Sequence, residues 1–319
     1  MEDKKEKLQS TNINCDKTIY RKFLEIIENT HFFTQRFFRI LYLKLIWGSE
    51  NMKLKVLVDN NTLIDMYYLG EPAVSYYIED GNDKILFDVG YSDVFMENAE
   101  KMNIDLNKVN KLVISHGHDD HTGGLNYFFK EKKNIELISH PASFNYKEDY
   151  TGLCIGSPFT KEELSKVCTL NLSKSPIKIS DNITYLGEIP TSNNFEKKYT
   201  IGKTVINGVE VEDKVEEDSG IVYQSAKGLF IITGCSHSGI CNIIEYAKKV
   251  CNDDRIYGVV GGFHLFKNDE RLQKTIEYFK DNNIELLYPC HCVSLEAKIE
   301  IAKQIKINEV GVGLELDIT

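Results

Sequence analysis

Hydrophobic residues recur with the spacing of β-strands through the first half of the chain, from residue 53 onward. Apolar runs, several of them alternating with polar positions, predict strands at 54–58, 74–79, 84–88, 111–115 and 136–139. Turn residues and short helical stretches separate these runs. The first half is therefore expected to be rich in strands.

The last third of the chain alternates strands with helices. After strands expected at 183–187, 220–224 and 229–233, helical patterns at 239–250, 270–281 and 295–305 alternate with strands at 256–260 and 284–288, and a final strand spans 309–318. Two strand-rich halves followed by helices suit an α/β fold with two sheets packed face to face and helices outside.

The region at about 141–182 is less regular. It contains three prolines, Pro141, Pro158 and Pro176, and its apolar positions follow no sustained period. We expect this region to supply loops that cover the substrate.

The first 51 residues differ from the rest, and we treat them as an extension preceding a domain at 52–319. Residues 29–49 contain no acidic residue, and Arg36, Arg39 and Lys44 interleave with aromatic side chains. This pattern fits an interfacial helix on an anionic membrane. A helix packed on the main domain or across a dimer is the favoured interpretation, and Met52 could also be the start of the functional domain.

Composition narrows the class of protein. A chain of 319 residues with 42% hydrophobic content can bury a sizeable core. The net charge of -10 argues against a nucleic-acid partner, because binding phosphates requires an excess of lysine and arginine. The eight cysteines are spread along the chain, as reduced thiols are, and no signal peptide is evident. We therefore expect a cytoplasmic protein.

Residues 115–124 carry the strongest chemical signal. They read Ser-His-Gly-His-Asp-Asp-His-Thr-Gly-Gly, which places four strong metal ligands within six residues: His116, His118, Asp120 and His121. The preceding apolar run predicts a strand, and the two glycines allow the backbone to turn afterwards. An exposed histidine-rich loop would explain neither the spacing nor these flanks. The cluster thus predicts a metal site at the carboxyl end of a strand.

Three more histidines lie in short motifs after apolar runs. His237 occurs in Gly-Cys-Ser-His-Ser-Gly, His264 in Gly-Gly-Phe-His-Leu and His291 in Pro-Cys-His-Cys. Only His31 and His140 fall outside such motifs. Four strand-end loops that carry histidine predict one composite site.

Together with Ile-Leu-Phe-Asp-Val-Gly at 85–90, these motifs resemble those of the metallo-β-lactamase fold superfamily. Within it they are similar to the branch of 7,8-dihydropterin-6-methyl-4-(β-D-ribofuranosyl)-aminobenzene-5'-phosphate synthase-like proteins, related to methanopterin biosynthesis. The resemblance covers about residues 52–319. It implies a four-layer αβ/βα sandwich with a site for one or two metals at the edge of the two sheets.

The resemblance also implies a set of ligands. The first metal would take His116, His118 and His237, and the second would take Asp120, His121 and His291. Of these, His237 rests on elimination, with His140 as the alternative. Cys235 stands where many members have a bridging aspartate. It is either a metal or bridging ligand, which favours zinc, or a small buried residue in a tight turn.

Two other residues receive roles near the metals. His264 is interpreted as an acid or anion contact that faces the substrate, or else as a core or capping histidine. Asp88 is expected to orient a ligand loop, or else to be a simple turn aspartate. The chain departs from the branch at Val293 and Ser294, where threonine and glycine are usual, and this puts one pocket wall in doubt.

Bound divalent ions lower the pKa of water from ~15.7 towards ~7, which makes hydroxide available at neutral pH. Asp120 can orient that water. The leading hypothesis is therefore a hydrolase with two divalent ions, zinc favoured over manganese or iron, that acts on a small anionic substrate such as a phosphate-bearing molecule. The alternatives are a pterin-related transferase or synthase and a non-catalytic metal-binding sensor. A β-lactamase is not favoured, because fold is a poor guide to substrate.

Overall fold

The computed structural model describes residues 51–131 and 134–319, and Asn51–Thr319 pack as one unit. The aromatic and basic segment at 29–49, His31 and all but the last residue of the expected extension lie outside the described residues. Within the described part of the chain, no helix is long and apolar enough to cross a membrane.

Two large mixed sheets form the centre of the fold. The seven-stranded sheet has the order β16-β1-β2-β3-β4-β5-β7 and the six-stranded sheet the order β15-β14-β13-β12-β9-β8. The strands of the first are β16 (Glu315–Ile318), β1 (Met52–Val58), β2 (Ser75–Asp80), β3 (Asp83–Phe87), β4 (Lys111–Val113), β5 (Glu136–Ser139) and β7 (Thr169–Leu172). Those of the second are β15 (Leu286–Pro289), β14 (Ile256–Gly261), β13 (Gly228–Thr233), β12 (Gly220–Ser225), β9 (Ile183–Tyr185) and β8 (Ile177–Lys178).

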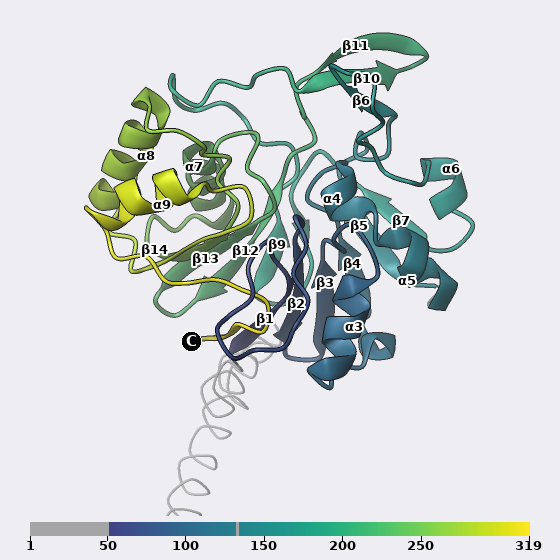
Figure 1. Ribbon diagram of the computed structural model, residues 1–319, viewed down its shortest axis with the longest axis horizontal. Helices are drawn as coiled ribbons and strands as arrows, with labels where there is room; N and C mark the ends of the chain where they lie inside the picture. The colour runs from purple at the N-terminus through teal and green to yellow at the C-terminus, as the bar shows by residue number, and fades with distance from the viewer. Residues whose placement is uncertain (1–50, 132–133) are drawn as a thin grey trace, which may run out of the picture. The chain divides into compact units, whose positions relative to one another are not determined.

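Helices cover the outer face of each sheet (Figure 1). On the first sheet lie α3 (Val94–Lys101), α5 (Leu125–Glu131) and α6 (Lys161–Leu164), and on the second α7 (Ile240–Cys251), α8 (Glu270–Asp281) and α9 (Leu295–Ala302). The short helices η1 (Leu106–Lys108) and α4 (Asp119–Thr122) complete the first half. This is the four-layer αβ/βα sandwich expected from the sequence.

Strand periodicity builds the three apolar cores between these layers. In β13, Phe230 and Ile232 enter the core between the sheets, whereas Leu229 and Ile231 face α7 and its neighbours. Successive side chains of a strand point to opposite faces, so a strand covered on both sides is apolar throughout. For this reason the buried strands were readily predicted.

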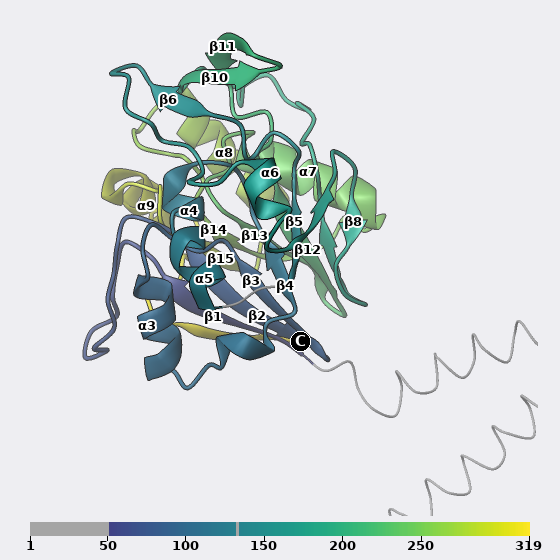
Figure 2. The same ribbon diagram turned by 90° about the vertical axis from the view of Figure 1, so that its right-hand side faces the viewer.

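The structure corrects three expectations about the elements. The region 141–182 is not only loop, because it contains α6, β7, β8 and β6 (Lys147–Asp149), and β7 extends the first sheet. β6 pairs with the unpredicted hairpin of β10 (Gly202–Ile206) and β11 (Val209–Asp213) in a small three-stranded sheet at one end of the molecule (Figure 2). The last strand is also shorter than 309–318, since Gly313 has a φ of 93° in the loop before it.

Strand direction sets the position of the candidate site. β3, β4 and β5 run parallel, and so do β13, β14 and β15. Parallel strands end at the same edge, so the loops that follow them gather there. The four predicted histidine motifs follow β4, β13, β14 and β15, which brings loops distant in the sequence to one edge of the sandwich.

Candidate metal centre

Two groups of donor side chains meet at this edge. The first contains His116, His118 and His237, and the second contains Asp120, His121, Cys235 and His291. Within each group, the candidate ligand atoms lie within 4.8 Å of one another. The groups adjoin, because the ring centroids of His116 and His121 are 4.2 Å apart.

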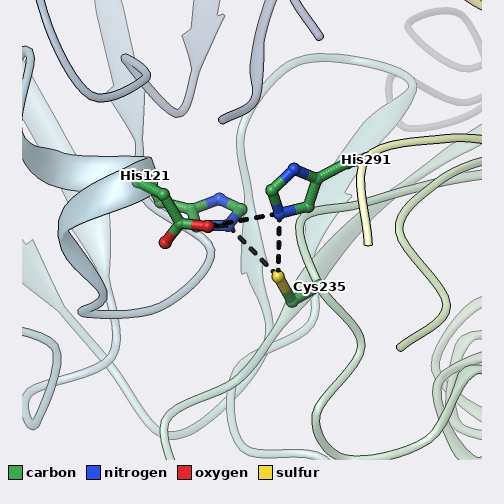
Figure 3. A group of neighbouring side chains, drawn as sticks. His121, Cys235 and His291 are labelled. Atoms are coloured by element: carbon green, nitrogen blue, oxygen red, sulfur yellow. Dashed lines mark hydrogen bonds and ion pairs between the residues drawn. The ribbon is translucent and has the colours of Figure 1, made fainter. Parts of the chain in front are cut away.

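The second group has the spacing of a metal site (Figure 3). Cys235 Sγ lies 3.1 Å from His291 Nε2 and 3.3 Å from His121 Nε2. Asp120 Oδ2 lies 3.3 Å from His291 Nε2 and 3.4 Å from His121 Nε2. Ligand atoms arranged tetrahedrally around zinc are roughly 3.3–3.6 Å apart. The four side chains therefore fit a single cation of this size.

The first group leaves buried nitrogen atoms without partners. His118 Nε2 and both ring nitrogens of His237 are shielded from solvent and make no hydrogen bond with the described residues. Burial of such groups unpaired is unfavourable. The His116 and His118 rings lie 4.8 and 4.9 Å from the His237 ring, and His116 Nε2 is 3.1 Å from His118 Nδ1. A cation between the three rings would bind one nitrogen of His237 that the described residues leave without a partner.

Hydrogen bonds at the Nδ1 atoms of His116, His121 and His291 leave the Nε2 atoms of these three rings free to bind a cation. Asp88 Oδ2 accepts from His121 Nδ1 at 2.7 Å and from the Ser115 hydroxyl at 2.7 Å, and His116 Nδ1 lies 2.9 Å from that hydroxyl. His291 Nδ1 lies 3.2 Å from Asn60 Oδ1. An imidazole that donates from Nδ1 keeps its Nε2 lone pair for a metal.

Local electrostatics favour cation binding. Burial, followed by the neighbouring imidazoles, lowers the pKa of His116 well below its usual value, and His237 behaves likewise. Burial also opposes charge on His121, but Asp120 and Asp88 outweigh it and raise its pKa. Because these two carboxylates favour a positive charge on the His121 ring, they would also favour a divalent cation bound to it. Burial, then Cys292, raises the pKa of the Cys235 thiol, which would lose its proton on metal binding.

The segment after β4 that carries His116, His118, Asp120 and His121, called the ligand loop here, is compact. Asp120 and His121 lie in α4, a single helical turn that begins after His118. Gly123 is helical rather than a flexible turn, and its role is close packing: a Cβ on Gly123 would lie 2.4 Å from the Tyr91 carbonyl oxygen, and one on Gly124 2.1 Å from that of Val89. The two glycines are therefore required because the backbone of the preceding loop approaches closely.

The remaining predicted residues fall outside the two groups. His264 lies beside them, with its ring 4.4 Å from that of His237, and hydrogen-bonds with Tyr199. Burial, then Arg271, lowers the pKa of His264 to about 3, so the ring is neutral at pH 7. His140 is turned away: its Nε2 lies 3.2 Å from Glu188. His237, not His140, is thus the histidine that joins His116 and His118.

Sequence analysis missed several residues that support the site. Asp59, fully buried, accepts the backbone N–H of His291 at 2.9 Å. Asp59 and Asn60 follow β1, so the same strand-end pattern could have indicated them. Lys147 is buried in ion pairs of 2.8 Å with Asp213 and Glu217. It carried no sequence signal, because its partners come from a distant hairpin and loop.

A cavity of about 480 Å³ opens onto both groups. Its lining includes His118, Asp120, His237, His264 and His291. Cavities of this size accommodate small molecules. Both groups of candidate ligands are therefore accessible to a small substrate.

Comparison with known proteins gives concordant results. Residues 69–248 match the family model of the metallo-beta-lactamase superfamily. The chain is 32% identical over 272 residues to the 7,8-dihydropterin-6-methyl-4-(beta-D-ribofuranosyl)-aminobenzene-5'-phosphate synthase of Methanocaldococcus jannaschii, covering 81% of this chain and 92% of that protein.

Solved structures show the same architecture. Tm1679, described as a metal-dependent hydrolase of the beta-lactamase superfamily, aligns with a TM-score of 0.73 and 31% identity over 84% of this chain and 99% of that one. Zinc-bound PqqB from Methylobacterium extorquens aligns with a TM-score of 0.50 and 12% identity over 83% of this chain and 100% of that one, which shows a shared fold alone.

Proposed function

Because this chain belongs to the metallo-β-lactamase superfamily, we propose that it is a metal-dependent hydrolase that acts on a small anionic substrate. One observation carries the proposal: seven donor side chains from separate loops converge in two adjoining groups beside an open cavity. Two divalent ions would be held there, the first by His116, His118 and His237. The other four donors would hold the second.

The donor set favours zinc. Zinc typically binds imidazole nitrogen and thiolate sulfur atoms, whereas magnesium and calcium prefer oxygen ligands. Cys235 is the discriminating residue, because its sulfur lies between two imidazole Nε2 atoms. When bound, the ions would supply Lewis acidity and lower the pKa of water toward neutrality.

Asp120 is assigned to position the attacking water. Burial would raise its pKa, but His121 and His291 outweigh burial and hold the pKa well below its usual value, so the carboxylate is ionised. Its Oδ2 faces the two imidazoles, while the side chain keeps 24% exposure in the cavity. The other oxygen can therefore accept a hydrogen bond from water and fix its orientation.

His264 is assigned to contact the substrate. Because its ring is neutral at pH 7, it suits a hydrogen bond to substrate rather than proton donation. The phenol of Tyr199 hydrogen-bonds with the same ring and holds it at the cavity wall.

A pterin-related synthase is the second candidate. It is supported by the relative from Methanocaldococcus jannaschii, whose length this chain covers almost completely. Mass spectrometry of small molecules that co-purify with the protein distinguishes the two candidates, since a bound pterin would favour the synthase.

The proposal is tested by metal analysis combined with a substrate panel. The purified chain should contain two divalent ions, with zinc in excess, and should hydrolyse an anionic member of a panel of phosphodiesters, thioesters, lactones and β-lactams. The double variant His118→Ala/Asp120→Ala should lose the metal and reduce turnover by about 10³-fold or more, as expected when the main electrostatic contribution is removed.

His140→Gln is the matched control, because this buried histidine belongs to neither group. It should retain both ions and full turnover. Unchanged metal content in the double variant, or no hydrolysis of any panel member by the metal-loaded wild type, would overturn the proposal.

A further inference from the structure

Arg271, in the first turn of α8, is a cation with no anionic partner among residues 51–131 and 134–319. Its Nε and Nη2 atoms are shielded from solvent and make no hydrogen bond with any described residue. No carboxylate oxygen of the described residues lies within 4.0 Å of a guanidinium nitrogen, the distance that defines an ion pair. The guanidinium lies over the face of Tyr199, whose ring centroid is 6.0 Å from the guanidinium carbon. This contact leaves the N–H donors of the guanidinium unused.

Other cations in the described part of the chain are neutralised differently. Arg255, the other described arginine, lies 2.7 Å from Asp253, and buried Lys147 has two carboxylates at 2.8 Å. A partly buried charge without a partner is unfavourable, because it has lost water without gaining a hydrogen bond or an ion pair. A cation retained only for stability would be expected to have a carboxylate partner, as Arg255 and Lys147 do, and Arg271 differs in this respect.

Neighbouring acidic side chains are already engaged. Asp269 accepts the backbone N–H of Leu272 at 3.0 Å, and Glu270 pairs with Lys274 at 2.7 Å. Glu196 accepts the backbone N–H groups of Cys241 and Asn242 at the start of α7. The positive charge of Arg271 thus remains available for an anion from outside the chain.

A row of rings connects Arg271 with the metal centre. From the guanidinium, the Tyr199 ring comes first, then the His264 ring at a centroid distance of 5.5 Å, and then the His237 ring at 4.4 Å. Tyr199 is 40% exposed, and Phe266, 49% exposed, packs against His264. The guanidinium is therefore connected to His237 through the Tyr199 and His264 rings, and Arg271 is not among the metal ligands.

We propose that Arg271 binds an oxyanion of the substrate, a phosphate or a carboxylate group, at a point separated from the reacting bond by the Tyr199 and His264 rings. This inference rests on the proposed function and specifies its substrate class: an elongated molecule with its charge remote from the bond that is broken. A guanidinium is suited to this task because its fork of N–H groups matches both anions. Arg271 is thus a specificity-determining residue.

The test uses the full chain, both as purified and after removal of metal, with inorganic phosphate and acetate as probes in titration calorimetry. Removal of metal separates anion binding at Arg271 from anion binding to the ions. Arg271→Gln should weaken binding of the preferred probe by about tenfold or more in both states, and Arg271→Lys should weaken it less. The probe that binds more tightly identifies the anion as phosphate or carboxylate.

Arg255→Gln is the matched control and should leave binding unchanged, because Arg255 already has its anion. Arg271→Gln should also leave the thermal midpoint equal to or above that of the wild type, because it removes a charge without a partner, and this result excludes a merely structural role. The proposal is overturned if Arg271→Gln binds both probes like the wild type, or if the metal-free wild type binds neither. These outcomes do not depend on hydrolysis, so failure of the proposed function is recognised separately.

For any panel substrate that is turned over, Arg271→Gln should raise KM and leave kcat nearly unchanged.

Discussion

Several residues of the site adopt a backbone conformation that side chains rarely tolerate. Asp88, Ser236, His264 and His291 have φ values of 55°, 60°, 50° and 50°. Left-handed conformations of non-glycine residues are unfavourable and persist where surrounding contacts fix them, often at functional sites. At Asp88 those contacts are visible, since it accepts three hydrogen bonds from Ser115 and His121. Asp88, His264 and His291 were identified from the sequence by residue type, but nothing in the sequence indicated their backbone strain.

Buried His140 should make the free energy of unfolding depend on pH. Burial lowers its pKa, although the hydrogen bond with Glu188 opposes this effect. The unfolded chain therefore takes up a proton near pH 6.5 while the folded chain resists it. The stability associated with neutral His140 is complete above about pH 6.5 and is lost as the pH falls below that value.

His140→Gln should remove this dependence. In urea titrations, the free energy of unfolding of the wild type relative to the variant should decrease between pH 8 and pH 5. The other histidines are present in both proteins, so their contribution to the pH dependence cancels when the two free energies of unfolding are subtracted. A constant difference over this range would contradict the prediction.

At the scale of elements, the small three-stranded sheet is anchored by one buried lysine. The side chain of Lys147 in β6 is 1% exposed and pairs with Asp213 at the end of β11 and with Glu217 in the following loop. Glu217 also accepts the backbone N–H of Gly117, at 3.3 Å, within the ligand loop. The sheet and the metal centre are therefore joined through a buried ion pair.

Lys147→Met should be strongly destabilising, because it leaves two buried carboxylates beside one another without a cation. We expect a loss of about 3–5 kcal/mol in the free energy of unfolding, measured by urea denaturation. Lys203→Met is the control: Lys203 pairs with Glu210 in the same sheet but is 51% exposed, so this variant should lose far less stability than Lys147→Met. Equal losses in the two variants would refute the anchoring role.

The elements themselves were predicted unevenly, for a physical reason. Strands buried on both faces, such as β13 and β14, are apolar throughout, and helices such as α8 keep a clear 3.6-residue period. The β11 strand is different, because its first four residues are exposed. Pairing with β10, which in turn pairs with β6, stabilises it, so no apolar pattern marked it in the sequence.

At the scale of the whole molecule, the proposed ions would connect the two halves of the sandwich. Their candidate ligands come from loops after β4 in the first sheet and after β13 and β15 in the second. A cation that binds the folded state alone adds stability in proportion to the logarithm of its concentration over Kd, about 2.7 kcal/mol at a hundredfold excess.

Removal of metal should therefore lower the thermal midpoint of the full chain by about 5 °C or more, as measured by calorimetry, and added zinc should restore it. The double variant His118→Ala/Asp120→Ala, which lacks ligands from both groups, should show no response to chelator or to zinc. A wild-type midpoint that is insensitive to both treatments would contradict the proposed centre.

The sequence by itself determined the order of the buried strands and helices, the sandwich they form and the ligand types gathered in the loops after β4, β13, β14 and β15. It could do so because periodicity and strand-end motifs are local properties of the chain. Only the tertiary structure decided that His237 and not His140 joins His116, and that Cys235 Sγ lies between His121 and His291. It also decided that Lys147 has carboxylate partners, whereas Arg271 has none in the described part of the chain. Those outcomes depend on distances between segments far apart in the chain, which no local pattern encodes.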